Sequence, residues 1–474
     1  MKQDNLINNN KYLQGIFEPI HFECDIENLE VIGNIPHELN GMLYKIGANP
    51  QFIYSSNYHL FEGDGMVHKI TFNNGKANYT NRYIRTQKFL KEQKVGHAIY
   101  AGFLDRVDKL KQIQEGLFPD TVNINVINHA NKLLAVNEGN DIYQIDNELN
   151  TLNKFTFTDD LPGMTAHPRI CPVTNQLIMY SYLSRDVITS NMIKYFIANG
   201  DGKIIHKENI SVPYKSMLHD FAITKDYIIF PIFPLTCNIA RLFNSENIYK
   251  WEHTLGCYFG IMPRFGKSED CIWIHQDEPG LAVHIVSAYQ EGDLVILDAC
   301  YSNDIPDNAD GFTPDNEETF PMYLTRWVFD VKKKIIVSKN KIDNVSCEFP
   351  KIDERYTGDK YNHVYVASTL HSKWYGHEFD AITHYDIRNH TKQVHNFGKD
   401  TLCVEPLFVP RNATSPEGDG FLLVFAYNKL TDTSDLVILD ANHVDKEPLG
   451  IVKIPHRVPF TFHAENYTNF YLTF

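Results

Sequence analysis

Four histidines stand in apolar or small-residue surroundings where an imidazole could bind a metal ion. They are His167 in GMTAHPRICP, His219 in SMLHDFAIT, His284 in LAVHIVSAYQ and His463 in RVPFTFHAENY. Neutral imidazole is the commonest metal ligand among protein side chains. A lone histidine in such a stretch is nevertheless more often the hydrogen-bonding partner of a nearby hydroxyl or carboxylate. The metal interpretation therefore requires that the four histidines meet in the fold.

Their spacing rules out any local motif. Successive histidines are separated by 52, 65 and 179 residues, so no helix face or loop can bring them together. A β-propeller can do so, because the inner strand of every blade directs side chains at one central axis. The spacing is thus compatible with a ring of ligands drawn from different blades.

Three glutamates stand alone in similarly apolar surroundings. They are Glu138 in LLAVNEG, Glu348 in SCEFPKID and Glu405 in CVEPLFVP. An unpaired carboxylate there would be costly to bury, so each needs a partner. A salt bridge to lysine or arginine is one account. The other is that each carboxylate accepts the remaining N–H of a metal-bound imidazole and offsets the charge of the metal.

Short strands must position these side chains. The segment 66–86 predicts a hairpin that turns at Asn74–Gly75, and 129–149 has the same form. Helical patterning is scarce, and residues 88–116 are its best candidate. Many short strands without a clear linker favour one all-β domain over residues 1–474, and closure into a propeller suits this length.

Composition limits the possible partners. The chain has 474 residues, 43% of them hydrophobic, and a formal net charge of -15, which disfavours nucleic acid as a partner. The start MKQDNLINNN lacks the apolar core of a signal peptide, and no run approaches the roughly 18 apolar residues of a spanning helix. None of the eight cysteines forms a CxxC pair. We expect a reduced, cytoplasmic protein, with possible peripheral contact with a membrane.

Beyond these residues, the sequence resembles the carotenoid cleavage oxygenases, which include the retinal pigment epithelium isomerase and the lignostilbene-cleaving enzymes. The resemblance runs nearly from end to end and is carried by blocks in the family order: YHLFEGDGMVHKI, AHPRICP, HDFAIT, VHIVSAYQEGDLVILDAC, EFPKID, EPLFVPR and RVPFTFHAEN.

This resemblance implies a fold, a cofactor and a reaction. It implies a seven-bladed β-propeller with a helical and loop cap that forms a substrate tunnel over the axial metal site. It makes the four histidines the ligands of a non-haem Fe(II) and the three glutamates the second shell, so that three of the four histidines have a carboxylate partner. The implied reaction uses O2 to cleave one C=C double bond of a carotenoid or apocarotenoid into two carbonyl products.

The same resemblance indicates tunnel residues and a substrate class. Ile124, Asn137, Phe221 and Val283 are the candidates for the tunnel. Asn137 stands where many carotenoid-cleaving members carry an aromatic residue and lignostilbene cleavers carry a lysine for the phenolic oxygen. A lipophilic polyene is therefore expected as the substrate. Apolar residues in 230–251 fall near the tunnel entrance of relatives and predict peripheral membrane contact, with ordinary packing as the alternative.

The sequence leaves three alternative functions open. The same scaffold could cleave a stilbene or phenylpropenoid, which is an aromatic alkene. It could act as an ester-cleaving retinoid isomerase that consumes no oxygen. It could also be a non-catalytic propeller that binds hydrophobic ligands, although such a module would gain nothing from a polar cluster of four histidines and three glutamates.

Denser histidine groups occur elsewhere in the chain. The family does not use them for iron, and they are expected to be turn, hairpin and surface residues: His59, His68, His371 and His377. Two glycines of the EGDGM segment, Gly63 and Gly65, are expected to adopt positive φ rather than to bind phosphate.

Overall fold

Strands dominate the described part of the chain. The computed structural model describes residues 10–464, apart from residues 103, 140, 162, 184–186, 188, 304, 306–319 and 373–376, together with the strand at 466–469. The mainly β architecture is as expected, and the helical segment at 88–116 is two short α-helices. These are α2 (Gln87–Val95) and α3 (Arg106–Gln114), and the 3-10 turns are η1 (Lys11–Leu13), η2 (Gly15–Phe17), η3 (Leu60–Glu62), η4 (Ile239–Asn244), η5 (Ser268–Asp270) and η6 (Glu354–Tyr356). Among the described residues, no helix is long and apolar enough to cross a membrane.

Two sheets combine strands from both ends of the chain. One has the order β1 (Cys24–Ile26), β5 (Lys76–Tyr83), β4 (Gly65–Asn73), β3 (Gly41–Ala48) and β32 (Asn466–Asn469). The other has the order β2 (Val31–Gly33), β31 (Gly450–Ile454), β30 (Thr433–Asp440), β29 (Gly420–Asn428) and β27 (Thr401–Cys403), with β28 (Leu407–Pro410) also paired to β29. The predicted hairpin at Asn74–Gly75 is confirmed, and both residues have positive φ.

Three four-stranded meanders follow the first sheet along the chain. They contain β6 (Asn125–His129), β7 (Lys132–Val136), β8 (Ile142–Ile145) and β9 (Thr151–Phe155); β10 (Arg169–Ile170), β11 (Leu177–Ser181), β12 (Met192–Ala198) and β13 (Ile204–Ser211); and β14 (Ala222–Ile223), β15 (Tyr227–Ile232), β18 (Cys257–Pro263) and β19 (Ile272–Gln276). A separate two-stranded sheet pairs β16 (Leu235–Cys237) with β17 (Tyr249–Trp251). The predicted hairpin in 129–149 is the pair β7–β8.

The largest sheet is two meanders that share one long strand. Its order is β20 (Leu281–Glu291), β21 (Leu294–Ser302), β22 (Tyr323–Asp330), β23 (Ile335–Lys351), β24 (His363–Thr369), β25 (Ala381–Asp386) and β26 (Thr391–Asn396). The first half of β23 pairs with β22, whereas its last residues pair with β24. The strand therefore passes from one meander to the next without a break.

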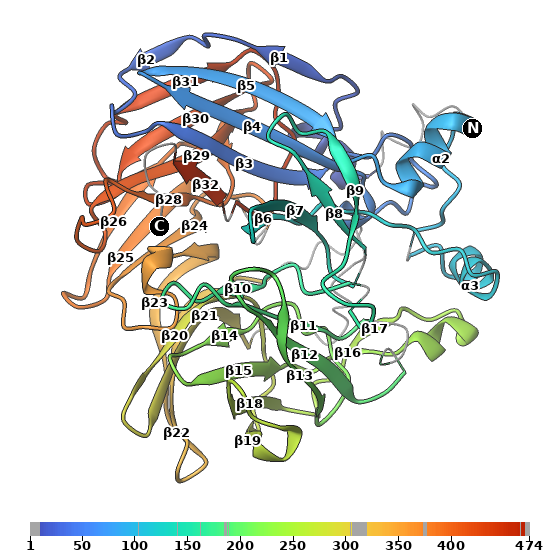
Figure 1. Ribbon diagram of the computed structural model, residues 1–474. Helices are drawn as coiled ribbons and strands as arrows, with labels where there is room; N and C mark the ends of the chain where they lie inside the picture. Colours follow the sequence, from blue (N-terminus) through green and yellow to red (C-terminus); the bar gives the residue numbers. More distant parts are fainter. Residues whose placement is uncertain are drawn as a thin grey trace.

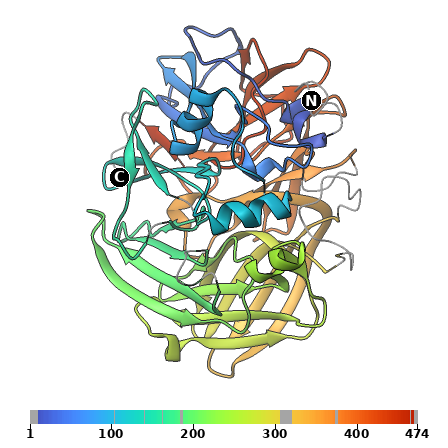
Figure 2. The same ribbon diagram turned by 90° about the vertical axis from the view of Figure 1, so that its right-hand side faces the viewer.

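The sheets follow one another around the molecule in chain order (Figure 1). They run from β3–β5 at the top, through β6–β9 and β14–β19, to β24–β26 at the left. Helices α2 and α3 both lie on the side that faces the viewer in Figure 2. The inward-facing residues of the sheets form several apolar clusters, the largest of which joins β3–β5 to β28–β31.

Lack of space, not backbone angle, explains the two glycines of the EGDGM segment. Gly63 has a φ of -63°, and Gly65 is not among the residues with positive φ, so the expectation is wrong. A Cβ at Gly65 would lie only 1.6 Å from the carbonyl oxygen of Val122, and one at Gly63 would lie 2.6 Å from the hydroxyl of Tyr58. Neighbouring chain approaches too closely for any side chain at either position.

Candidate metal centre

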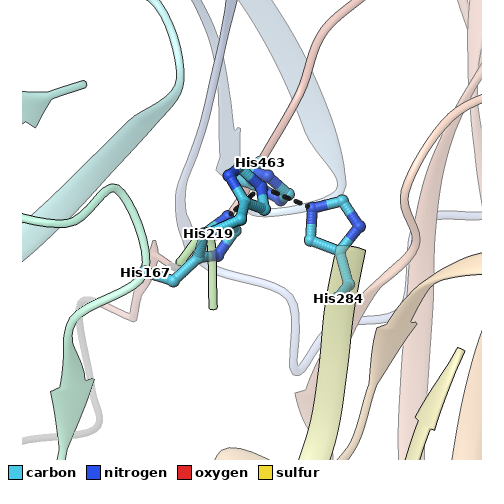
Figure 3. Close-up of side chains that lie close together, drawn as sticks. All are labelled: His167, His219, His284 and His463. Carbon is cyan, nitrogen blue, oxygen red and sulfur yellow. Dashed lines mark hydrogen bonds between the residues drawn. The ribbon is translucent and has the colours of Figure 1, made fainter. Parts of the chain in front are cut away.

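The four histidines singled out from the sequence lie together in the fold. One ligand nitrogen from each of His167, His219, His284 and His463 lies within 4.8 Å of the others, and all four residues are buried. The Nε2 atom of His219 is 3.0 Å from that of His167 and 3.2 Å from that of His284. Figure 3 shows the imidazoles turned toward one another from different segments of the chain.

Each histidine lies on or just before a strand at the end of its sheet. His284 is within β20, which ends the largest sheet. The other three precede the terminal strands β10, β14 and β32 by two or three residues: His167, His219 and His463. Terminal strands of separate sheets, or the residues just before them, thus bring all four side chains to one point.

Backbone hydrogen bonds fix the segments that carry three of these rings. The hydroxyl of Thr165 accepts from the N–H of His167 at 3.1 Å and donates to the carbonyl of His219 at 3.4 Å. The N–H of His463 donates to the carbonyl of Ile124 at 3.2 Å. The last bond ties the end of the chain to the start of β6.

The three glutamates each contact a different histidine. The Nδ1 atom of His219 is 2.6 Å from Oε1 of Glu138, and that of His463 is 2.9 Å from Oε1 of Glu405. The Nδ1 atom of His284 hydrogen-bonds to Oε2 of Glu348. A carboxylate can only accept, so each of these imidazoles carries its proton on Nδ1, donates that N–H to the glutamate and directs the lone pair of Nε2 inward.

Further contacts hold two of the three carboxylates in place. The hydroxyl of Tyr182 donates to the free oxygen of Glu138 at 2.9 Å. Glu405 lies 3.3 Å from the Nζ of Lys351 and 3.9 Å from that of Lys45, and both lysines are buried. Burial lowers the pKa of Lys45 to about 8, against the opposing attraction of Glu405. The two ammonium groups and His463 outweigh burial and hold the pKa of Glu405 well below its usual range.

The surroundings of the rings shift their pKa values and so control which imidazoles are neutral and able to bind a metal ion. Burial, reinforced by the neighbouring imidazoles, holds the pKa of His167 well below 6.5. Burial likewise lowers the pKa of His463 to about 3. For His219 burial acts in the same direction, but the Glu138 carboxylate outweighs it and raises the pKa. His167 and His463 are therefore neutral donors at physiological pH.

This donor set fits a divalent metal ion. His219 and His284 both donate their Nδ1–H to a carboxylate, so their Nε2 lone pairs face each other at 3.2 Å, which a shared cation makes favourable. Metal–imidazole bonds of about 2.1 Å place adjacent ligand nitrogens about 3 Å apart. Four imidazoles alone suit several first-row metals, including iron, copper, nickel and zinc.

Three of the four tunnel candidates adjoin a histidine or glutamate of this centre, through a hydrogen bond or as the preceding residue in the chain. Ile124 is buried and bonds through its carbonyl to His463, whereas half-buried Val283 precedes His284. Asn137 precedes Glu138 and accepts from its N–H at 2.6 Å. The ring of Phe221 is fully buried, with Tyr180 5.1 Å and Phe230 6.4 Å away between ring centroids. Phe221 thus contributes to the core between sheets.

The other histidine groups do not join the centre. Among the described residues, the four-histidine set is the group able to hold a metal ion. His68 lies in β4 of the predicted hairpin and His59 precedes the turn η3, but neither is at the surface: both are buried, and burial lowers the pKa of each to about 3. Exposed His371 pairs with Asp380 at 2.8 Å, and the ring of His377 reaches the hydroxyl of Tyr12 at 3.1 Å.

Sequence reasoning missed four residues around the centre. They are Lys45, Lys351, Tyr182 and Phe349, whose ring lies 4.9 Å from that of His284 and 5.4 Å from that of His463. Lys45 in YKIGANP and Lys351 in EFPKID are single cations in apolar blocks, which was the available signal. Nothing local in the sequence sets Tyr182 apart from other buried tyrosines.

Comparison with known proteins gives consistent matches over almost the whole chain. The profile of the retinal pigment epithelial membrane protein family matches residues 17–466. Isoeugenol monooxygenase of Pseudomonas putida is 29% identical over 96% of this chain and 98% of its own length. Carotenoid 9,10(9',10')-cleavage dioxygenase 1 of Arabidopsis thaliana is 30% identical over 96% of this chain and 89% of its own length.

Solved structures agree with these matches. Lignostilbene dioxygenase of Pseudomonas brassicacearum superposes with a TM-score of 0.88 at 27% identity, covering 97% of this chain and 98% of that one. The apocarotenoid oxygenase of Synechocystis, crystallised also in a cobalt-substituted form, gives 0.84 at 25% identity and covers 95% of this chain and 97% of that one.

The histidine–carboxylate pairing predicts graded losses of metal. His219→Ala removes a ligand nitrogen and should abolish stoichiometric binding of Co²⁺ or Fe²⁺. Glu348→Gln keeps all four imidazoles but removes the charge behind His284, so affinity should fall by about 10- to 100-fold. Equilibrium dialysis followed by metal analysis measures both. Glu291→Gln, in the same strand β20 but paired with exposed Lys360, is the control and should bind as the wild type. Undiminished binding by either site variant would contradict the assignment of that residue.

Proposed function

Because this chain belongs to the retinal pigment epithelial membrane protein family, that of the carotenoid cleavage oxygenases, we propose that it is a non-haem Fe(II) dioxygenase that cleaves a C=C double bond. The substrate of this proposal is a lipophilic polyene, a carotenoid or apocarotenoid, which O2 converts into two aldehyde or ketone products. The relatives named for such chemistry span nearly the full chain.

One observation carries the proposal: four buried imidazoles converge, and three of them each contact a carboxylate. His167, His219, His284 and His463 would hold the iron. The choice of iron among the metals that imidazole suits rests on the family. Bound there, Fe(II) supplies the reactivity toward dioxygen that a ground-state alkene lacks.

The chain's own residues would orient, shield and balance charge. Glu138, Glu348 and Glu405 fix the tautomer and plane of three imidazoles and offset the cation charge. Phe349 and the buried sheet ends exclude bulk water from the rings. Cleavage of a C=C bond by this route requires no general acid or base, and none is assigned.

We further infer a single domain over residues 1–474 that closes as a seven-bladed propeller. Seven meanders support it: the two sheets built from both chain ends, the three meanders β6–β9, β10–β13 and β14–β19, and the two that share β23. The strands β2 and β32 join the two ends of the ring. In this proposal α2 and α3, which lie on one side of the molecule, contribute to the cap (Figure 2).

Asn137 favours a polyene over a phenolic substrate. Its amide nitrogen donates to the hydroxyl of Thr121 and to Oδ1 of Asn123, both at 3.0 Å, and to the Thr121 carbonyl. Its oxygen accepts from the N–H of Glu138. Both N–H groups of Asn137 are thus used within the chain, and it has no donor left for a phenolic oxygen. The second candidate is a stilbene or phenylpropenoid. It is favoured because the chain resembles isoeugenol monooxygenase and lignostilbene dioxygenase about as closely as it resembles the carotenoid-cleaving relatives.

The products distinguish these functions. Iron-loaded protein incubated with an apocarotenal should consume O2 and release two carbonyl fragments, which mass spectrometry identifies. A phenolic stilbene and isoeugenol, tested in parallel, should be cleaved more slowly because Asn137 offers their phenolic oxygen no hydrogen-bond donor. Faster cleavage of the phenols would select the second candidate. An isomerised alcohol without O2 uptake, or no turnover by iron-loaded protein, would overturn the proposal.

We also propose peripheral membrane contact through the 230–251 segment and the adjacent helix α3. Phe243 in η4 is 67% exposed and Val107 in α3 is 70% exposed, whereas Leu242 is buried. Arg106 joins the two elements by donating to Asn247 at 2.8 Å and to the Ser245 carbonyl.

The exposed pair predicts a loss of vesicle binding. Val107→Ser/Phe243→Ser removes two apolar side chains, each worth about 1.5–3 kcal/mol when buried, and should lower binding to phosphatidylcholine vesicles at least about ten-fold. Flotation of protein with vesicles measures it. Phe265→Ser, at a 55% exposed site elsewhere, should leave flotation unchanged. Equal flotation of the double variant and the wild type would remove this contact from the proposal.

A further inference from the structure

Arg169 and Asp220 form an ion pair between two histidine-bearing segments. Arg169 lies two residues after His167, and Asp220 directly follows His219. The Nη2 atom of Arg169 is 2.7 and 2.9 Å from the two carboxylate oxygens of Asp220. Asp220 is buried and the arginine side chain is only 13% exposed, so water screens the pair weakly.

The pair also reaches the segment of a third histidine. The N–H of Ile285 donates to Oδ2 of Asp220 at 2.8 Å, and Arg169 donates to the Ile285 carbonyl at 3.3 Å. Ile285 follows His284 in β20. The register of β20 against β21 is irregular on both sides of Ile285. Asp220 thus hydrogen-bonds to the backbone directly after His284, where the pairing of β20 with β21 is irregular.

The remaining contacts of the pair fix the backbone just after His219. The N–H of Phe221 donates to Oδ1 of Asp220 at 2.7 Å, and Nε of Arg169 donates to the Phe221 carbonyl at 3.1 Å. Both carboxylate oxygens therefore accept from the arginine and from one peptide N–H each. These bonds join the segments of three rings, whereas His463 is held separately through Ile124 and Glu405.

We infer that Arg169 and Asp220 are positioning residues that hold three of the four imidazoles in metal-binding geometry before the metal binds. The inference rests on the proposed function, since it concerns the same metal. Ligands must be held within about 0.5 Å of their productive positions by neighbours whose own conformations are fixed. Without the pair, the loops of His167 and His219 and the bulge at His284 lose their common anchor, and binding must order them.

The chain offers a matched ion pair away from the centre. Arg326 in β22 donates through Nε and Nη2 to the two oxygens of Asp298 in β21, at 2.7 and 2.6 Å. Asp298 is as buried as Asp220, and its carboxylate also accepts from the hydroxyl of Tyr361. Asp298→Asn therefore removes the same kind of interaction from a pair whose side chains form no hydrogen bond to the residues flanking the four histidines, although Asp298 lies opposite Ser287 of β20 in the sheet.

Cobalt binding to metal-free protein tests the inference. Wild type, Asp220→Asn, Arg169→Lys and Asp298→Asn are stripped with chelator and titrated with Co²⁺, followed by visible absorption. Asp220→Asn and Arg169→Lys should bind Co²⁺ at least about ten-fold more weakly, with altered absorption bands, as for other residues that support metal ligands. Asp298→Asn should keep wild-type affinity. Thermal unfolding of the metal-free forms measures stability: Asp220→Asn and Arg169→Lys should lower Tm no more than Asp298→Asn does.

The outcomes separate this inference from the proposed function. Wild-type affinity in folded Asp220→Asn and Arg169→Lys would overturn the positioning role. Failure of both to fold without metal, while Asp298→Asn folds, would overturn it as well, because the pair would then serve the fold itself. A wild type that binds no Co²⁺ would instead overturn the proposed metal function.

Discussion

Four buried nitrogen lone pairs that face one another impose the constraint on which the site depends. Carboxylates behind His219, His284 and His463 accept hydrogen bonds from the Nδ1–H groups, so the Nε2 lone pairs point inward. The low pKa values of His167 and His463 keep these two imidazoles unprotonated, so their lone pairs stay available. Such a cluster is favourable around a cation and costly otherwise. The buried glutamates and their own partners follow from this need.

The fold meets that need by bringing the ends of separate sheets to one point. No two of the four histidines come from the same sheet, and the last arrives only when the chain end returns to β3. The N–H of Phe462 bonds to the Ile46 carbonyl, and the next N–H, of His463, bonds to Ile124. The bonds that bring His463 to the site are therefore among those that join the two ends of the chain. Metal binding should accordingly stabilise the association of the two ends.

Residue types in apolar runs made much of this predictable, because local pattern reports burial. The strands and the turn at Asn74–Gly75 could be expected from residue patterns, whereas the grouping of the four histidines with the three glutamates was implied by the family resemblance. Which glutamate meets which histidine could not, since that depends on how separate sheets pack. The same limit explains the errors: Gly65 is small because Val122 approaches from the segment before β6, and buried His68 hydrogen-bonds to the hydroxyl of Tyr79 in the neighbouring strand β5. Contacts between distant segments leave no local signal.

The central claim is that imidazoles far apart in the sequence bind one metal ion, which diffraction at a metal absorption edge tests most directly. Crystals of iron-loaded protein, measured above and below the iron edge, should give one strong anomalous peak per chain. That peak should lie about 2.1 Å from Nε2 of His167, His219, His284 and His463. A peak at any other group of side chains, or iron-loaded crystals in which the four rings lie apart from the metal, would contradict the account.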